Sequence, residues 1–395
     1  MSRRPRASIL TLAGGRWWNG GAKGPVTLLV EKGLVAAAGG TEERKEADLA
    51  GRVILPGMVN AHDHLDFSIF PALGRPPYAN AYDWIADAES GPPNAAVTAA
   101  LTVPLPDRLF LGGLRNLLAG VTAVAHHNPY HRALGRPDFP VRVLERYHFA
   151  HSPGLTPALR RTYRTTDRRI PWMVRAAEGT DERSRTELDL LAEANVLRQN
   201  TLVIHGIALG EDEARRMAAA RACLVWCPEA NRRLYGATAQ IAAMRAAGVR
   251  IALGSDSPAS GVRDPLSNLA AARAENVFTD VELIDLATRA SAEVARLPLG
   301  GAEVGQPADL LVTSSVEALL AGDRRAVALV VSRGRVLYGE PALLESLGVK
   351  SRQLTVDGAP RALDAPLAER AAGLLRRHPA MATVPWLRGL VFGSP

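Results

Sequence analysis

Apolar and polar residues follow two different patterns along this chain. Between residues 8 and 55, short apolar runs such as 26–30 are separated by glycines, which is typical of hairpins in a small β unit. From about residue 53 to residue 300, short β-rich runs alternate with stretches rich in Ala, Arg, Glu and Leu that are typical of helices. The β-rich runs lie at 121–125, 202–204, 223–226 and 249–253, and the helical stretches at 184–197 and 211–220.

This alternation predicts an α/β fold. Strands that alternate with helices form parallel sheets, and so many units over roughly 250 residues favour a closed (β/α) barrel over an open sheet. Short apolar runs return at 309–312 and 327–331, so the two ends of the chain are expected to form one β domain, and 366–377 has a helical pattern. The predicted parts are a barrel at 55–304, a composite β-sandwich from residues 1–54 and 305–345, and a helical extension at 346–395.

Charge and composition exclude several classes of protein. The net charge is +7, but the basic residues are scattered without a block of five or six, which indicates a solvated surface and no nucleic-acid partner. No run of about 18 apolar residues or signal-peptide core appears, so we expect a cytoplasmic protein that does not bind a membrane. Cys223 and Cys227 are too few for a disulfide framework or a structural zinc site.

Two histidines at the expected end of the first barrel strand are the strongest candidates for chemistry. His62 and His64 lie two residues apart on an extended segment, so both imidazoles point to one side and can reach one metal ion. Taken alone, this spacing also fits solvated histidines at a strand end. Barrel enzymes, however, carry their active sites at the carboxyl ends of the strands.

Two more polar residues follow predicted strands. His205 ends the run 202–204, and Asp256 follows 249–253. Each has an ordinary alternative role, since a single His is often held by a core hydrogen bond and an Asp often caps a helix or turn. Their common position at strand ends favours a metal site that includes both.

At this point the sequence resembles the amidohydrolase superfamily, in particular its cytosine/guanine deaminase and chlorohydrolase branch. The resemblance rests on five motifs between residues 56 and 310: Pro56-Gly57-x-x-Asn60-x-His62-x-His64, Ile204-His205-Gly206, Cys227-Pro228-Glu229-Ala230-Asn231, Leu253-Gly254-Ser255-Asp256 and Gly305-Gln306-Pro307-Ala308-Asp309-Leu310. It implies a distorted (β/α)8 barrel with a composite β-sandwich. It also implies one divalent metal and hydrolysis at a carbon that bears nitrogen or another leaving group. The expected reaction is hydrolysis of a carbon–nitrogen bond of a small molecule, with a cyclic molecule as one option.

The same resemblance implies roles for individual residues. His62, His64 and Asp256 would be metal ligands, and Asp256 would also take a proton from the nucleophilic water. His205 would ligate the metal or hold the hydroxide or the substrate's oxygen, and Glu178 would carry the proton to the leaving group. Asn231 would contact the substrate.

One departure from the family pattern concerns the metal, and another is Ala230, where the family more often has a serine. The family's His-x-x-Glu motif has Arg175 in place of the histidine, and Arg cannot ligate a metal, so it is either a substrate contact or a defect. His126 or His127, after the run 121–125, offers a replacement ligand, with hydrogen-bonded loop histidines as the alternative. No Lys occurs between residues 46 and 349, which excludes a pair of metals bridged by a carboxylated lysine. One ion is expected, most simply zinc, with iron or manganese as alternatives.

A few residues outside these motifs are candidates for contact with the substrate. Aromatic and polar residues after the first strand can stack on a flat molecule or pack at the barrel rim, and a histidine after residue 147 can add a polar group. These residues are Tyr78, Asn80, Tyr82, Trp84 and His151. The expected partner is a small-molecule substrate, and a homodimer is one option for the assembly. The alternative to an enzyme is a non-catalytic relative that binds or scaffolds, which Arg175 motivates.

Overall fold

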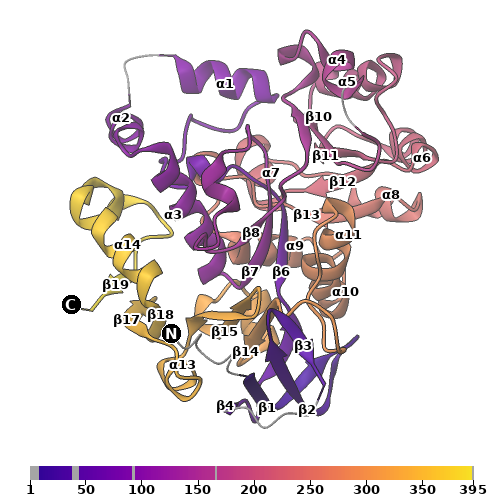
Figure 1. Cartoon of the computed structure of the whole chain (residues 1–395). Helices are drawn as coiled ribbons and strands as arrows, with labels where there is room; N and C mark the ends of the chain where they lie inside the picture. The colour runs from indigo at the N-terminus through magenta and orange to yellow at the C-terminus, as the bar shows by residue number, and fades with distance from the viewer. Residues whose placement is uncertain (1–8, 38–43, 91–93, 165–166, 394–395) are drawn as a thin grey trace.

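The computed structural model describes residues 9–37, 44–90, 94–164 and 167–393 (Figure 1). It has the predicted α/β character, with two sheets of parallel strands and one large mixed sheet. Residues 1–8 and 38–43, which belong to the predicted N-terminal β unit, lie outside the described residues.

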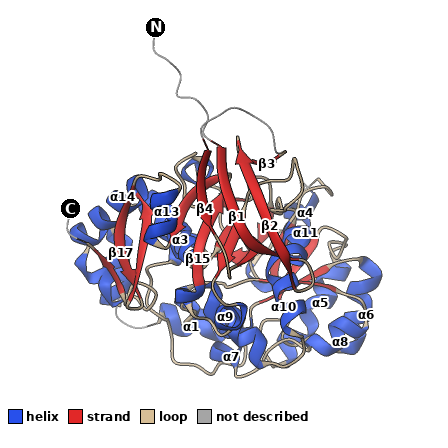
Figure 2. Ribbon diagram, turned by 90° about the horizontal axis from the view of Figure 1, so that it is seen from below, coloured by secondary structure: helices blue, strands red, loops and turns tan. Residues whose placement is uncertain are grey.

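The large sheet joins the two ends of the chain. Its strands are β1 (Ile9–Trp18), β2 (Ala22–Glu31), β3 (Leu34–Ala36), β4 (Arg44–Asp48), β5 (Val53–Pro56), β14 (Leu310–Thr313), β15 (Val327–Ser332), β16 (Arg335–Gly339), β17 (Ser351–Val356), β18 (Ala359–Asp364) and β19 (Leu390–Phe392). Their order is β19-β17-β18-β16-β15-β14-β5-β1-β2-β3, and β4 pairs with β1. The two halves of the chain meet where β5 pairs antiparallel with β14. Figure 2 shows β1, β2, β4 and β15 crossing the middle of this face, with helices to both sides.

Eight further strands carry the parallel pairing. They are β6 (Met58–Asp63), β7 (Val121–His126), β8 (Arg142–Val143), β9 (His148–Ala150), β10 (Trp172–Ala176), β11 (Thr201–His205), β12 (Cys223–Trp226) and β13 (Arg250–Leu253). One sheet has the order β6-β7-β8 and the other β13-β12-β11-β10-β9. A parallel bridge between Asp63 and Asp256 joins the β6 and β13 ends of the two sheets. Among the described residues β8 and β9 do not pair, so the strands do not form one closed ladder.

Helices separate most of these strands along the chain, as the pattern predicts, and the last three helices follow β14 or later strands of the large sheet. They are α1 (Ala81–Glu89), α2 (Ala95–Thr102), α3 (Leu105–Leu118), α4 (Leu159–Arg164), α5 (Glu182–Glu193), α6 (Glu211–Ala220), α7 (Pro228–Tyr235), α8 (Ile241–Ala246), α9 (Pro265–Ala274), α10 (Asp280–Asp285), α11 (Ser291–Ala295), α12 (Val316–Leu320), α13 (Pro341–Ser346) and α14 (Ala365–Arg377). In the part of the chain that the structure describes, none is long and apolar enough to cross a bilayer.

Strand β14 packs against two hydrophobic cores at once. Successive side chains of a strand point to opposite faces. Leu311 therefore belongs to the large core shared with the parallel strands, while Leu310 and Val312 belong to the core under α13. At Gly120, where φ is +83°, an added Cβ would lie 2.9 Å from Leu311 Cδ1. The turn before β7 therefore requires glycine, and Leu311 fixes the sheet against the parallel strands.

The expectation of a helical extension at 346–395 is corrected by the structure. The helical pattern at 366–377 does form α14, but β17, β18 and β19 extend the large sheet. The hairpin between β17 and β18 turns at Asp357 and Gly358, with φ of +48° and +81°. Positive φ at both central residues gives the turn favoured by two-residue hairpins, and Asp-Gly is one of its usual sequences. The predicted boundaries at residues 54 and 305 stay a prediction.

We predict that Leu311→Ala destabilises the whole fold. The side chain is fully buried between the sheet and the parallel strands, so its truncation should lower the free energy of unfolding by about 2–5 kcal/mol. Urea denaturation measures this change. Leu101→Ala is the matched control, because Leu101 is 57% exposed and its loss should change stability by about 0.5 kcal/mol or less. Equal effects of the two substitutions would contradict the role of Leu311.

Candidate metal centre

The ends of β6 and β13 bring three potential ligands together. His62 and His64 lie on the same face of the extended segment that closes β6, and Asp256 follows β13. Asp256 N donates to His62 O over 3.0 Å, and His64 N donates to Asp256 O over 3.0 Å. These backbone bonds hold the two strand ends side by side, so the position of one ligand sets that of the others.

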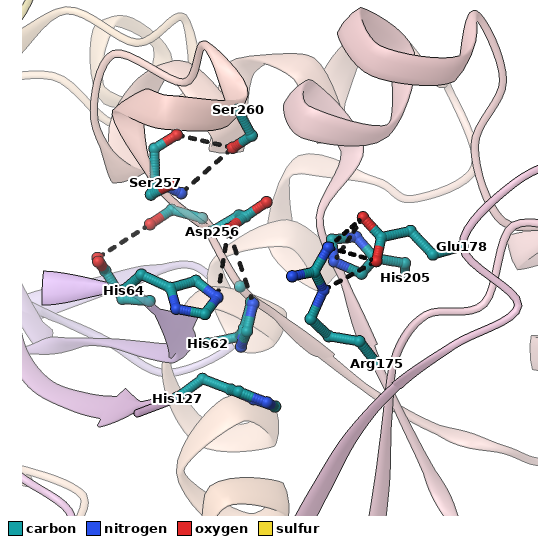
Figure 3. Close-up of polar contacts among 12 residues, drawn as sticks. His62, His64, His127, Arg175, Glu178, His205, Asp256, Ser257 and Ser260 are labelled. Atoms are coloured by element: carbon teal, nitrogen blue, oxygen red, sulfur yellow. Dashed lines mark hydrogen bonds and ion pairs between the residues drawn. The ribbon is translucent and has the colours of Figure 1, made fainter. Parts of the chain in front are cut away.

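The side chains of these residues face one another (Figure 3). Asp256 Oδ1 lies 3.9 Å from His62 Nε2 and 3.7 Å from His64 Nε2, and one ligand atom from each of the three residues lies within 4.8 Å of the others. Two ligands about 2.0–2.1 Å from a tetrahedral zinc are about 3.4 Å apart. The cluster therefore needs only small adjustments to surround a divalent ion.

Unpartnered polar atoms test whether a metal fits here. Both ring nitrogens of His62, Nδ1 of His64 and Oδ2 of Asp256 are buried and have no hydrogen-bond partner among the described residues. Each such atom costs about 1–3 kcal/mol unless something binds it. Burial lowers the pKa of His62 and of His64 well below the usual value, so both rings are neutral and keep the lone pairs that a cation needs. The donor set fits a divalent metal.

A second group of polar residues lies beside the first, at the ends of β10 and β11. His205 Nδ1 donates to Asn231 Oδ1 over 2.8 Å, which fixes the ring and leaves Nε2 facing Glu178 Oε1 at 3.5 Å. The predicted residues Glu178, His205 and Asn231 are therefore brought together, with Asn231 touching His205. Asn231 is fully buried.

Arg175 makes an ion pair with Glu178. Its Nε donates to Glu178 Oε2 over 2.8 Å and its Nη2 to Oε1 over 3.0 Å, and Tyr235 donates its hydroxyl to Oε1 over 2.7 Å. Burial opposes ionisation of Glu178, but Arg175, His205 and Tyr235 together outweigh it and lower the pKa of this carboxyl. On β10, where the family motif has a histidine, Arg175 therefore binds the carboxylate of Glu178. Tyr235 also belongs to the site, although it was not predicted from the sequence.

Strain marks the same strand ends. Ala177, His205 and Asp256 have φ of +53°, +75° and +58°, a conformation that is uncommon for residues other than glycine. Such conformations cost about 1–3 kcal/mol each and persist where the surrounding structure holds them for a function. Their hydrogen bonds hold them here: His62 O accepts from Asp256 N, and Glu187 Oε2 accepts from Ala177 N over 2.6 Å.

The two candidate replacement ligands point in different directions. The ring centre of His127 lies 4.9 Å from that of His62 and 5.5 Å from that of His64, whereas His126 Nδ1 accepts from Leu65 N over 3.3 Å. His127 Nε2 contacts Ala150 O at 3.1 Å, and its Nδ1 is buried without a partner among the described residues. His127, and not His126, therefore borders the cluster. The exposed His151 lies beyond it, with 6.0 Å between the two ring centres.

The residues predicted to contact substrate from the rim have other contacts. Asn80 caps α1 and donates to Asp181 over 2.7 Å, the Tyr78 hydroxyl donates to Asp87 over 2.5 Å, and the Tyr82 hydroxyl donates to Glu187. These contacts favour the alternative of packing at the rim. Trp84 is the exception, since its ring lies 5.7 Å from the Cζ of Arg175.

The segment that carries these rim residues covers the site. Tyr78 N donates to Leu234 O, and Ala81 N donates to Glu178 O over 2.9 Å. Trp84 packs in a small apolar cluster with Ile207 and Leu234. In Figure 1, α1 lies above the parallel strands, at the end away from the large sheet. None of the ligand residues is more than 3% exposed, so the site is enclosed.

Comparison with known proteins agrees with this geometry. Residues 170–337 match the model of the amidohydrolase family. The 5-methylthioadenosine/S-adenosylhomocysteine deaminase of Halobacterium salinarum is 26% identical over 345 residues, covering 73% of this chain and 79% of that protein. The aminodeoxyfutalosine deaminase of Deinococcus radiodurans is 28% identical and covers 61% of this chain and 74% of its own length.

The chain is similar to amidohydrolases in sequence and in fold. The predicted resemblance is therefore confirmed. Solved structures show the same fold: a zinc-bound adenosine deaminase from Xanthomonas campestris has a TM-score of 0.71 at 17% identity, covering 95% of this chain and 100% of that one. A triazine hydrolase variant has a TM-score of 0.63 at 18% identity, covering 83% of this chain and 94% of that one.

A buried carboxyl group supports the turn that precedes Glu178. Glu187 on α5 is 2% exposed, and it accepts from Ala177 N and from the Tyr82 hydroxyl. Burial raises the pKa of Glu187 to about 7, although both hydrogen bonds oppose the rise. Glu187 thus ties α1 and α5 to the turn before Glu178.

Substitution of a metal ligand and substitution of His126 should have different effects on zinc affinity. We predict that His62→Ala lowers zinc affinity by more than about 100-fold, because the loss of a ligand should exceed the 10–100-fold cost typical of losing a residue that only supports one. His126→Ala should keep its zinc, since His126 faces Leu65. Zinc content after dialysis against a competing chelator measures both. Loss of zinc from His126→Ala alone would contradict the assignment.

The buried carboxyl of Glu187 should make stability depend on pH. Between about pH 4.5 and 7 the folded protein keeps a proton that the unfolded chain has lost, so stability falls as the pH rises. We predict that Glu187→Gln removes this pH-dependent contribution to the free energy of unfolding. The unfolding free energy of the wild type minus that of the variant should then fall by about 3 kcal/mol between pH 4.5 and 7.5. Urea denaturation across this range tests it, and a difference that does not change with pH would contradict the prediction.

Proposed function

We propose that this chain is a metal-dependent hydrolase that cleaves a carbon–nitrogen bond of a small molecule, in the manner of a deaminase or amide hydrolase. The observation that carries the proposal is the buried cluster of His62, His64 and Asp256, whose ligand atoms lie within 4.8 Å of one another. Glu178 and His205 lie at the same end of the strands. The predicted reaction class agrees with the names of the relatives, which are deaminases.

The finer points of the fold and the metal belong to the same proposal. The eight parallel strands form the distorted (β/α)8 barrel of residues 55–304, and residues 1–54 with 305–345 form the composite β domain. The site holds one ion, and zinc is the simplest choice, because two imidazoles and a carboxylate are common zinc ligands. Zinc is bound in two similar structures, the adenosine deaminase and the chlorohydrolase TrzN of Arthrobacter aurescens.

The reaction requires a nucleophile and a proton path. A divalent cation, when bound, lowers the pKa of a water toward about 7 and polarises the substrate. The oxygen of the water bonds to the substrate carbon, the carbon–nitrogen bond breaks, and the nitrogen leaves with a proton. Enclosure of the site by the rim segment keeps other water away from the reacting atoms.

The carboxylates and His205 have distinct tasks in this scheme. Asp256 takes one proton of the water. Glu178, which Arg175 and Tyr235 hold ionised, accepts a proton that originates from the same water and passes it to the leaving nitrogen. His205 has its Nδ1 committed to Asn231, so its Nε2 is the atom that can hold the substrate's oxygen or serve as a further ligand.

A non-catalytic binding protein is the competing function, and Arg175 is the observation that favours it. A cation close to a metal site weakens metal binding unless a carboxylate neutralises it. Glu178 supplies that carboxylate, with two hydrogen bonds to the guanidinium. Metal analysis of the purified protein separates the two functions. About one bound zinc, iron or manganese ion per chain supports the enzyme, and a metal-free chain that does not respond to added metal supports the scaffold.

We predict that Glu178→Gln lowers turnover by about 10²–10⁴-fold when wild type and variant are both compared at saturating zinc, which offsets any metal affinity lost with the charge that compensates Arg175. The amide keeps the shape of the side chain but cannot carry the proton. A screen of amino-substituted heterocycles and amides, read by ammonia release, supplies the substrate for this comparison. Asp189→Asn is the control, because Asp189 is an exposed carboxylate on α5. Unchanged turnover in Glu178→Gln would remove Glu178 from the mechanism.

A further inference from the structure

We propose that Arg175 forms an anion subsite beside the three ligand residues, so that the substrate carries a carboxylate or a similar negatively charged group next to the bond that is cleaved. This inference rests on the proposed function, since it names the class of substrate that the same site takes.

The guanidinium of Arg175 is held rigidly and is only partly used. Its Nε and Nη2 donate to Glu178, and no described residue accepts from Nη1. Figure 3 shows Nη1 pointing away from Glu178, toward the side of the site where Asp256 and His62 lie. Nη1 and the remaining hydrogen of Nη2 form a second edge that matches the two oxygens of a carboxylate.

The surroundings of Arg175 keep it in this place. The residue is 8% exposed, and the ring of Trp84 lies 5.7 Å from Cζ. Glu178 is itself anchored by the hydroxyl of Tyr235. An arginine fixed in this way loses little freedom when it binds a ligand, which is the condition for a strong contact.

A binding experiment on zinc-loaded protein tests the subsite with matched small molecules. Benzoate and benzamide have the same shape and differ in charge, and calorimetry measures the affinity of each. We expect benzoate to bind about 10- to 100-fold more tightly than benzamide, the size of effect typical of a charge-assisted hydrogen bond pair. Equal affinities for the two compounds, or no binding of benzoate, would overturn the proposal.

Variants assign the preference to Arg175. The double variant Arg175→Met with Glu178→Gln removes both members of the ion pair and so leaves no buried carboxylate unpaired. It should lose the preference for benzoate. Arg175→Lys, which keeps the charge without the planar edge, should retain part of it, and is informative if the double variant does not fold. Arg183→Met is the control, because Arg183 stacks on Tyr82 outside the site. Retention of the full preference by the double variant would overturn the proposal.

Zinc content measured on the same samples separates this inference from the proposed function. Zinc bound with no preference for benzoate means that the anion subsite is wrong while the metal centre stands. A preference for benzoate that needs Arg175 in protein that binds no zinc means that the subsite stands while the hydrolase proposal fails.

Discussion

The geometry of the metal centre depends on a buried carboxylate that does not face it. Asp63 lies between His62 and His64 and points to the opposite side of β6. Its Oδ2 accepts from Asn60 over 2.9 Å, Arg115 over 2.6 Å, Asn116 over 2.9 Å and Ser255 over 3.2 Å. The two histidines are its neighbours in sequence and Ser255 precedes Asp256, so one carboxylate sets the relative position of all three ligand residues. Loss of one partner from a buried ion pair costs about 3–5 kcal/mol, which would act directly on this alignment.

Arg175 and Glu178 form the second buried ion pair, and it changes the chemistry of the site without destroying it. A guanidinium at a position where the family usually has an imidazole would repel a metal ion if it were alone. Here Glu178 compensates it through two hydrogen bonds, and Tyr235 supports Glu178. The metal loses one potential ligand, while the site gains a fixed donor edge. The ring centre of His127 lies 4.9 Å from that of His62, and its Nδ1 has no partner among the described residues, so a further imidazole can approach the cluster here.

The sequence carried much of this architecture in local patterns. The runs that predicted strands became β7, β11, β12 and β13, and the helical run 211–220 is α6. His62, His64 and Asp256 converge because carboxyl ends of parallel strands share one edge, a rule that needs no side-chain detail. Long-range partners of polar residues follow no such rule. Tertiary packing alone determines that Tyr235 contacts Glu178. It also determines that His127, and not His126, faces the metal ligands. The prediction for residues 346–395 missed β17, β18 and β19, because it rested on the helical pattern of 366–377 and did not use the turn sequence Asp357-Gly358.

The pairing of β5 with β14 has a consequence for how the chain reaches its native state. Strand β5 lies between β1 and β14 in the large sheet, so its free edge is not covered until residue 310 and beyond have left the ribosome. Contacts between residues so distant in sequence form slowly, and an unpaired strand edge is a site for association with other chains. During synthesis β5 therefore keeps one edge unpaired until β14, which begins at residue 310 of 395, has been made. This interval exposes the nascent chain to aggregation.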